Sequence, residues 1–425
     1  MRTWIPKGAK GTIAKKLWLP EASKIYGRKT MNAWIERESK VVAQTYARYP
    51  VVFVKGEGCT LFDDEGKAYT DFLSGIAVCN LGHAHPKVAE AISQQATELC
   101  HVSNLFYTQP MVELAEWLTE RCFADKLFLC NSGAEANEAA IKLARKYFHD
   151  KGEERPRFIT MSRSFHGRTM ATLSATGQDK IKEGFSPLVP GFEHVSFNDA
   201  AKLAEIMDDK VCAVLVEPLQ GEGGVCAPDD GYLEKVREIC DTHGALLIFD
   251  EIQTGMGRTG KLFAHQHTNI NPDIMTLAKA LGNGLPIGAM LATDKVMASF
   301  SKGAHGSTFG GTPLVTAAAL AVVKAFDEEK VVEKGAEMGA YFRGTLEGLA
   351  SKYSFIKEVR GMGLLLGMEI EGDGAEIVKK CLEKGQVINA VQGNTLRFVP
   401  PLTISREEID ALMGVLDEVF SEMSV

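Results

Sequence analysis

The middle of the chain alternates short apolar runs with amphipathic stretches. Apolar runs of strand length lie at 126–130, 157–161, 212–217 and 245–251. A helix is predicted after the first run, because the following apolar positions have helical spacing: Ala136, Ala139, Ala140, Leu143, Ala144, Tyr147 and Phe148. Another helix is predicted over 231–244, ended by its last glycine. Apolar strands separated by helices predict an α/β fold with a mostly parallel sheet covered on both faces.

From about Thr312 the pattern changes to longer helices and fewer strands. Residues 312–326 and 331–349 have helical patterns, and short strands are predicted at 364–370 and 396–402. The last helix begins with Ser405 and Glu408 at the spacing of a capping box. This part of the chain is therefore predicted to form a smaller α+β domain.

We expect four segments. Residues 1–30 contain eight Lys or Arg and a single acid, Glu21, and are expected to be a basic, non-catalytic extension, with a targeting segment as the alternative. Residues 31–75 are expected to join the small domain, 76–311 to form the large domain, and 312–425 to form the C-terminal small domain.

Composition excludes several classes of protein. The net charge of −8 argues against nucleic-acid binding, which usually requires a basic face. No apolar run approaches the roughly 18–20 residues of a membrane span. The nine cysteines form no CxxC pair, so reduced thiols and a cytoplasmic location are expected.

Two charged residues lie in apolar surroundings. Lys279 is the only charged residue of 276–289, and a desolvated lysine can act as a Schiff-base nucleophile. The alternative is a helical lysine that extends its amine to water. Asp250 ends an apolar run, at the edge of the sheet where ligands bind in open α/β folds. The alternative for Asp250 is a helix cap or a surface carboxylate.

Three loop segments supply complementary groups. Residues 130–137 join a strand to a helix through small residues, which exposes backbone N–H groups to a phosphate, and Ser132 adds a hydroxyl. Residues 306–311 place hydroxyls between glycines, and 164–169 bring an aromatic ring and an arginine. A lysine, an acid, a flat ring and phosphate donors together indicate a site for pyridoxal 5'-phosphate (PLP).

Two other patterns carry less weight. Residues 255–260, GMGRTG, match the dinucleotide fingerprint, but no clear helix opens after them, and acidic residues precede them. The histidine pairs His83/His85 and His265/His267 lack a third ligand at sensible spacing, so no metal site is expected.

Taken in order, eight segments resemble the class III (ω-) aminotransferases of PLP fold type I, and among them most closely the acetylornithine aminotransferases. The segments are GIAVCNLGHAHPKV, NSGAEANEAAIKLAR, SFHGRT, EPLQGEGG, DEIQTGMGRTG, LAKALGNGLPIGA, GSTFGG and LRFVPPL. The resemblance covers the chain from about residue 40 to its C-terminus. It implies that residues 76–311 bind PLP.

The resemblance assigns cofactor roles by position. Lys279 would form the imine with PLP and shuttle a proton, and Asp250 would pair with the pyridine nitrogen. Gln253 would hydrogen-bond near the ring hydroxyl, and Phe165 would stack on the ring.

The phosphate of PLP would be held by a second group of residues. Ser132, Gly133 and Ala134 would cradle it within the same subunit. Thr308 would reach the phosphate of the neighbouring subunit, which implies a homodimer with active sites at the subunit interface.

Substrate contacts are also implied. Arg168 would bind the carboxylate farthest from the reacting amine, and Arg397 would bind the one beside the reacting carbon. Glu222 would pair with Arg397 when that carboxylate is missing. Ile76 offers no polar partner to a free α-amine, which disfavours ornithine, and Tyr46 is expected to line the pocket.

The expected reaction is transfer of the δ-amino group of N-acetylornithine to 2-oxoglutarate, giving glutamate, as in arginine biosynthesis. The alternative substrates are 4-aminobutyrate, succinylornithine and N-succinyl-diaminopimelate. Rivals from other classes are a non-catalytic PLP-binding regulator and a nicotinamide oxidoreductase that uses GMGRTG.

Overall fold

The computed structural model describes residues 31–423, so the predicted basic extension, residues 1–30, lies outside it. The described chain divides into two compact units, one with residues 31–55 and 62–68 and the other with 56–61 and 69–423. The first unit contains helix α2 (Met31–Val41). Arg48, which follows the helix in the same unit, forms an ion pair with Glu38 at 3.0 Å. The boundary passes through three strands, β1 (Phe53–Glu57), β2 (Thr60–Asp63) and β3 (Ala68–Asp71).

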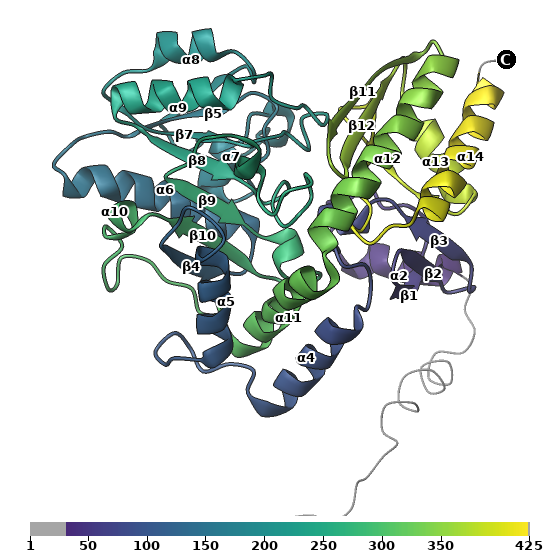
Figure 1. Cartoon of the computed structure of the whole chain (residues 1–425), viewed down its shortest axis with the longest axis horizontal. Coiled ribbons are helices and arrows are strands. Elements are labelled where there is room, and N and C mark those ends of the chain that lie inside the picture. Colours follow the sequence, from purple (N-terminus) through teal and green to yellow (C-terminus); the bar gives the residue numbers. More distant parts are fainter. Residues whose placement is uncertain (1–30, 424–425) are drawn as a thin grey trace, which may run out of the picture. The chain divides into compact units, whose positions relative to one another are not determined.

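The larger unit is built around a seven-stranded sheet (Figure 1). Its strands are, in spatial order, β4 (Lys126–Cys130), β10 (Gly288–Ala292), β9 (Ile274–Leu277), β8 (Leu246–Asp250), β7 (Val211–Val216), β5 (Arg157–Met161) and β6 (Phe192–Val195). Within this sheet, β10 runs opposite to the other six strands. The predicted α/β fold with a mostly parallel sheet is confirmed.

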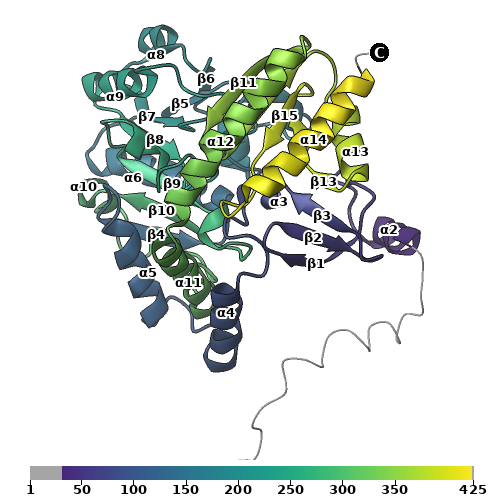
Figure 2. The same ribbon diagram turned by 45° about the vertical axis from the view of Figure 1, so that its right-hand side comes forward.

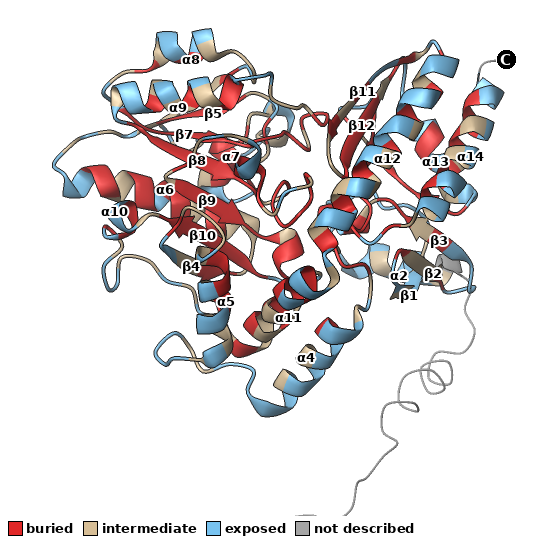
Figure 3. Cartoon of the chain, viewed as in Figure 1, coloured by how far each residue is buried: buried red, intermediate tan, exposed pale blue. Residues whose placement is uncertain are grey.

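Apolar helices cover both faces of this sheet. Helix α6 (Gly133–Asp150) buries Leu143 in a cluster with Leu215 and Ile248 of the strands. Neighbouring strand residues point to the opposite face, where α9 (Tyr232–His243) and α8 (Ala200–Ile206) pack. Strands buried on both faces read as continuous apolar runs, which explains the sequence pattern. Figure 3 shows these strands as buried, with β7 and β8 between α9 and α6.

A second, antiparallel sheet lies in the C-terminal part of the larger unit, together with long helices (Figure 2). The strands are β11 (Ile356–Met362), β12 (Leu365–Ile370), β15 (Thr395–Phe398) and β14 (Asn389–Val391), in that order. The helices are α11 (Pro313–Glu329), α12 (Val331–Lys352), α13 (Ala375–Glu383) and α14 (Arg406–Met423). The predicted capping box of α14 is confirmed, because Ser405 and Glu408 each accept the other's backbone N–H, at 3.2 and 2.8 Å.

Shorter elements connect these layers. They are α3 (Ser74–Ala77), α4 (Pro86–Glu98), α5 (Gln109–Thr119), α7 (Met170–Ala175), η1 (Asp179–Ile181), η2 (Ala264–His267), η3 (Lys279–Leu281), α10 (Asp294–Met297) and β13 (Gln386–Val387). Among residues 31–423, no helix has both the length and the apolar character needed to cross a bilayer.

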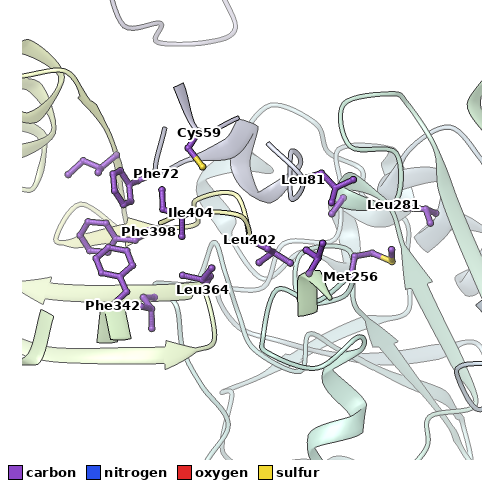
Figure 4. Close-up of a cluster of buried hydrophobic side chains, with 14 of the residues drawn as sticks. Cys59, Phe72, Leu81, Met256, Leu281, Phe342, Leu364, Phe398, Leu402 and Ile404 are labelled. Carbon is purple, nitrogen blue, oxygen red and sulfur yellow. The ribbon is translucent and has the colours of Figure 1, made fainter. Parts of the chain in front are cut away.

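A continuous apolar cluster joins the helices and loops of the larger unit (Figure 4). The side chains labelled there are Cys59, Phe72, Leu81, Met256, Leu281, Phe342, Leu364, Phe398, Leu402 and Ile404. Phe342 of α12 contacts both Phe72 and Phe398, with ring centroids 5.7 and 5.3 Å apart. The predicted small-domain helices therefore share one core with segments from the N-terminal half.

Arg258, the arginine of GMGRTG, is completely buried and ties three segments together. Its guanidinium donates to the backbone oxygens of Leu364 (2.9 Å) and Pro400 (2.5 Å) and to the side-chain oxygen of Asn80. Burial lowers the pKa of Arg258 to about 9. Neighbouring Gly257 and Gly260 have positive φ angles, so the glycines of this segment form turns around the arginine. These contacts give GMGRTG a structural role in the described chain.

We predict that Arg258→Met destabilises the protein by about 3 kcal/mol, because three buried acceptors lose their donor. The free energy of unfolding from urea titration measures the effect. Arg406→Met is the matched control: Arg406 is an exposed partner of Glu337, and its loss should change stability by less than about 1 kcal/mol. Equal effects of the two substitutions would contradict the structural role of Arg258.

Candidate functional site

Strand direction brings the candidate residues together. Because β10 lies antiparallel between β4 and β9, the strands β4, β5, β7, β8 and β9 all run the same way. Their carboxyl ends therefore meet at one edge of the sheet, where ligands bind in open α/β folds. The segments that follow these ends contain nearly all the residues selected from the sequence.

A cavity of about 460 Å³ opens at this edge. The predicted residues that line it are Ser132, Gly133, Ala134, Phe165, Arg168, Glu222, Asp250, Gln253 and Lys279. Other lining residues include His166, Glu217 and Ile252, none of which was selected from the sequence. This volume lies within the usual range of small-molecule sites, roughly 300–1,000 Å³.

The N-terminus of helix α6 forms one wall of the cavity. Ser132 is the N-cap, and its hydroxyl accepts the backbone N–H of Glu135 at 3.2 Å. A Cβ at Gly133 would lie 2.7 Å from the side chain of Ile252, so the close approach there requires glycine. The unpaired N–H groups of a helix N-terminus favour a phosphate or another anion.

Asp250 ends β8 and is 3% exposed. One oxygen, Oδ2, accepts hydrogen bonds from Asn137 Nδ2 at 2.7 Å and from His166 Nδ1 at 2.8 Å. The other, Oδ1, accepts the backbone N–H of Ile252 at 3.1 Å. The sequence analysis missed Asn137 and His166, although a polar residue on the alanine-rich face of α6 was a signal.

Lys279 extends into the cavity from the turn after β9. Its backbone has φ +45°, a conformation that is uncommon for residues other than glycine. Burial lowers the pKa of Lys279, against the attraction of Glu222 and Asp250. The pKa of Lys279 is therefore lowered despite the nearby carboxylates, and a lowered pKa is what a nucleophilic amine requires.

Glu217 is a buried acid beside these groups. Burial and the nearby Asp250 raise the pKa of Glu217 well above its usual range. Its Oε2 accepts the backbone N–H of Phe165 at 3.1 Å. Glu217 therefore holds the loop that carries Phe165, and its raised pKa favours the uncharged carboxyl group.

Arg397 of β15 is 1% exposed and reaches the site through an ion pair. Its Nη1 donates to Glu222 and, at 3.4 Å, to Gln253 Oε1, while its Nε donates to Asn389 Oδ1 at 3.3 Å. Burial alone would raise the pKa of Glu222, but Arg397 and Lys279 outweigh it and lower that pKa. Glu222 thus forms an ion pair with the guanidinium group of Arg397 in this structure.

Arg168 is exposed and lies at a different part of the cavity wall. Its guanidinium carbon lies 5.8 Å from the centre of the Phe165 ring. The site therefore contains one arginine covered by a glutamate and a second that is open to solvent.

Four predicted residues do not line this cavity: Arg397, which contacts the lining residues Glu222 and Gln253, and three others. Ile76, at φ +67°, belongs to a run of four residues with positive φ, Ser74–Ala77, and its neighbour Val78 lines the cavity. Thr308 lines a separate hollow with Ser307 and Asn104. Tyr46 belongs to the other unit and is 73% exposed. Their expected roles stay predictions.

The histidines selected as possible metal ligands have other partners. His83 Nε2 bonds to Asp71 at 2.7 Å, and His265 Nδ1 bonds to Glu251 at 3.0 Å. Within residues 31–423, no group of three or more His, Cys, Asp or Glu is arranged to hold a metal ion.

Comparison with known proteins gives concordant results. The family model described as "Aminotransferase class-III" matches residues 41–420. An acetylornithine aminotransferase of Methanocaldococcus jannaschii is 52% identical over 391 residues, which cover 92% of this chain and 98% of that protein. One from Caldanaerobacter subterraneus is 51% identical over 391 residues, covering 92% and 99%.

Solved structures are similar over nearly the whole chain. The ornithine aminotransferase of Toxoplasma gondii has a TM-score of 0.92 at 35% identity, covering 96% of this chain and 99% of that one. The acetylornithine aminotransferase of Elizabethkingia anophelis has a TM-score of 0.84 at 36% identity, covering 93% and 100%.

The lowered pKa of Lys279 predicts a pH-dependent stability of the cofactor-free protein. In the unfolded chain lysine titrates near about 10.4, so below that pH the unfolded state binds more protons than the folded state. The free energy of unfolding should therefore rise with pH through the window between the lowered pKa and the ordinary one.

Lys279→Met removes this contribution, so the variant should exceed the wild type in stability at neutral pH, and the difference should shrink as pH rises. Urea unfolding across a pH series measures it. Lys302→Met changes an exposed loop lysine and serves as the control. A difference that stays constant with pH would contradict the assignment.

Proposed function

The chain belongs to the class-III aminotransferases, and from this membership we propose that it transfers the δ-amino group of N-acetylornithine to 2-oxoglutarate, with PLP as its cofactor. The products are N-acetylglutamate semialdehyde and glutamate. The observation that carries the proposal is the Glu222–Arg397 ion pair beside Lys279, because it suits an enzyme that must accept two different substrates in turn.

The residues that line the cavity match the chemical groups of PLP. The N-terminus of α6, at Ser132–Ala134, would hold the phosphate, and Phe165 would lie against the ring. Asp250 would pair with the ring nitrogen, and Gln253 would bond near the ring hydroxyl. Class-III aminotransferases use PLP, which when bound supplies an aldehyde for the amine and an electron-withdrawing ring.

Lys279 would hold the aldehyde carbon of the cofactor until a substrate amine replaces it. Its Nζ would then take a proton from the substrate carbon that carries the amine. The lowered pKa of Lys279 supports this role, since only the neutral amine can accept a proton. Glu222 and Arg397 carry opposite charges, so as an ion pair they would add little net charge beside Lys279.

The two arginines would divide the substrate carboxylates between them. N-acetylornithine has no carboxylate beside its δ-amine, so Glu222 can stay on Arg397 in that half of the reaction. Glutamate and 2-oxoglutarate have a second carboxylate, which would take the place of Glu222 as a bidentate partner of Arg397. Arg168 would hold the distant carboxylate in both halves.

Apolar character around Ile76 supports an acylated α-amine. Ile76 is 39% exposed and offers no hydrogen-bond partner to a free ammonium group. Such a surface disfavours free ornithine and accepts an acetyl group.

We infer a homodimer as the active unit. Large apolar side chains are exposed in 105–107 and at Phe309, next to Thr308 in the chain. Exposed apolar surface of this kind marks subunit interfaces. Thr308 would reach the phosphate held by the partner subunit.

The central test compares amine donors in single half-reactions. N-acetylornithine, succinylornithine, ornithine and 4-aminobutyrate are each mixed with the PLP-loaded protein, and the loss of its visible absorption is followed. The fastest loss is expected with N-acetylornithine. A preference for 4-aminobutyrate would overturn the substrate, and no response to any amine would overturn the aminotransferase function.

Lys279→Ala should abolish steady-state transamination, lowering kcat by at least about 10³-fold, because among residues 31–423 no other lysine lines the cavity to move the proton. Glutamate formation from N-acetylornithine and 2-oxoglutarate measures it. Borohydride should attach PLP covalently to the wild type and not to the variant. Covalent attachment at another residue would refute the role of Lys279.

Arg397→Ala and Arg168→Ala should separate the two halves of the reaction. Arg397→Ala should lower kcat/KM for 2-oxoglutarate by about 10²-fold while sparing N-acetylornithine, since a charge-assisted bidentate contact is lost. Arg168→Ala should impair both substrates, and Arg406→Ala, at an exposed ion pair, is the control. Equal losses for both substrates in Arg397→Ala would contradict the division of carboxylates.

A further inference from the structure

The hydrogen bonds of Asp250 are distributed unequally between its two oxygens. A carboxylate has about four acceptor positions, two on each oxygen. Asn137 and His166 occupy both positions of Oδ2, whereas Ile252 occupies one position of Oδ1. A single acceptor position therefore remains, and it belongs to Oδ1.

The side-chain amide of Asn137 is locked in one orientation. Thr276 of β9 donates its hydroxyl to Asn137 Oδ1 at 2.8 Å. The amide nitrogen then donates one hydrogen to Asp250 and the other to the backbone oxygen of His166, at 2.7 and 2.8 Å. A flipped amide would turn Oδ1 towards two acceptors, the Asp250 carboxylate and the His166 backbone oxygen, so these two fix its orientation, and the Thr276 hydroxyl anchors the opposite end of the amide.

His166 is also constrained by its partners. It is 1% exposed, and its Nδ1 contacts Asp250 while its Nε2 has no hydrogen-bond partner among the described residues. A carboxylate oxygen can only accept, so the hydrogen lies on Nδ1 and His166 donates it to Asp250.

Segments far apart in the chain thus hold the carboxylate at the end of β8. Asn137 of α6 and His166 of the loop after β5 donate to it, and Thr276 of β9 donates to Asn137. Three donors reduce the cost of burying the carboxylate in an apolar sheet edge. They also prevent it from rotating, because both oxygens have fixed partners.

We propose that Asn137 and His166 are positioning residues that saturate Oδ2 of Asp250 and so direct Oδ1 alone to the ring nitrogen of the cofactor, with Thr276 holding Asn137 in place. This inference rests on the proposed PLP-dependent function and assigns positioning roles to three further residues. Pairing through one fixed oxygen keeps the ring nitrogen protonated at a defined position, which is the condition for its electron-withdrawing role.

Two pairs of variants test the proposal. His166→Ala removes the donor to Oδ2, and His166→Asn places an amide N–H in a similar position. Thr276→Val removes the hydroxyl that anchors Asn137, with little change of shape, and Thr276→Ser keeps it. Thr276 does not line the cavity, and its hydroxyl donates to Asn137, so the loss of that hydroxyl acts on the Asn137 side chain.

The readouts are the affinity of the cofactor-free protein for PLP and the nitrogen NMR shift of the ring nitrogen in isotope-labelled bound PLP. His166→Ala should weaken affinity about 10- to 100-fold, and Thr276→Val roughly three- to tenfold, by the loss of charge-assisted and neutral hydrogen bonds. In both, the ring-nitrogen shift should move towards the deprotonated form. His166→Asn and Thr276→Ser should restore affinity and shift.

His265→Asn is the matched control, because His265 is a buried histidine bonded to the neighbouring carboxylate, Glu251. It should lower stability without altering PLP affinity or the ring-nitrogen shift. Wild-type shift and affinity in folded Thr276→Val and His166→Ala would overturn the inference; should His166→Ala fail to fold, Thr276→Val alone decides it. Failure of the wild type to bind PLP would instead overturn the proposed function.

Discussion

The buried charged side chains around Lys279 depend on one another. Each has an opposite charge or a hydrogen-bond donor within reach, and without such a partner its burial in an apolar interior would be costly. Glu222 pairs with Arg397, Asp250 receives three N–H donors, and burial raises the pKa of Glu217, which accepts the backbone N–H of Phe165. The arrangement requires the carboxyl ends of five strands to lie at one edge, and the strand order of the sheet provides that. The helices packed on both faces of the sheet hold the strands in that order.

Backbone strain is concentrated next to the same edge. Lys279 has a positive φ, and Ser74–Ala77 form a run of four such residues before Val78, which lines the cavity. Strained conformations of this kind persist only when surrounding contacts hold them. Asp71 provides such contacts, since its Oδ1 accepts the backbone N–H groups of Leu73 and Ser74, both at 2.8 Å. The strained segment before Val78 is therefore held by hydrogen bonds to Asp71.

Elements with a local signal were predictable. The strands at 126–130 and 157–161 have the bounds expected from their apolar runs, and α14 begins at its capping box. The antiparallel direction of β10 was not predicted, because strand pairing depends on partners far along the chain. Arg258 was considered only within a fingerprint, since its partners at Asn80, Leu364 and Pro400 are more than a hundred residues away.

The sequence by itself determined the chemical groups of the site and their order, because Lys279, Asp250 and the small-residue loops occur in segments with recognisable local patterns. Tertiary structure decided how those groups act together. It placed Asn137, His166 and Thr276 around Asp250, and it closed Glu222 onto Arg397, contacts between elements separated by tens to hundreds of residues. No local pattern encodes such contacts, because hydrogen-bond geometry and burial arise only when the strands and helices pack.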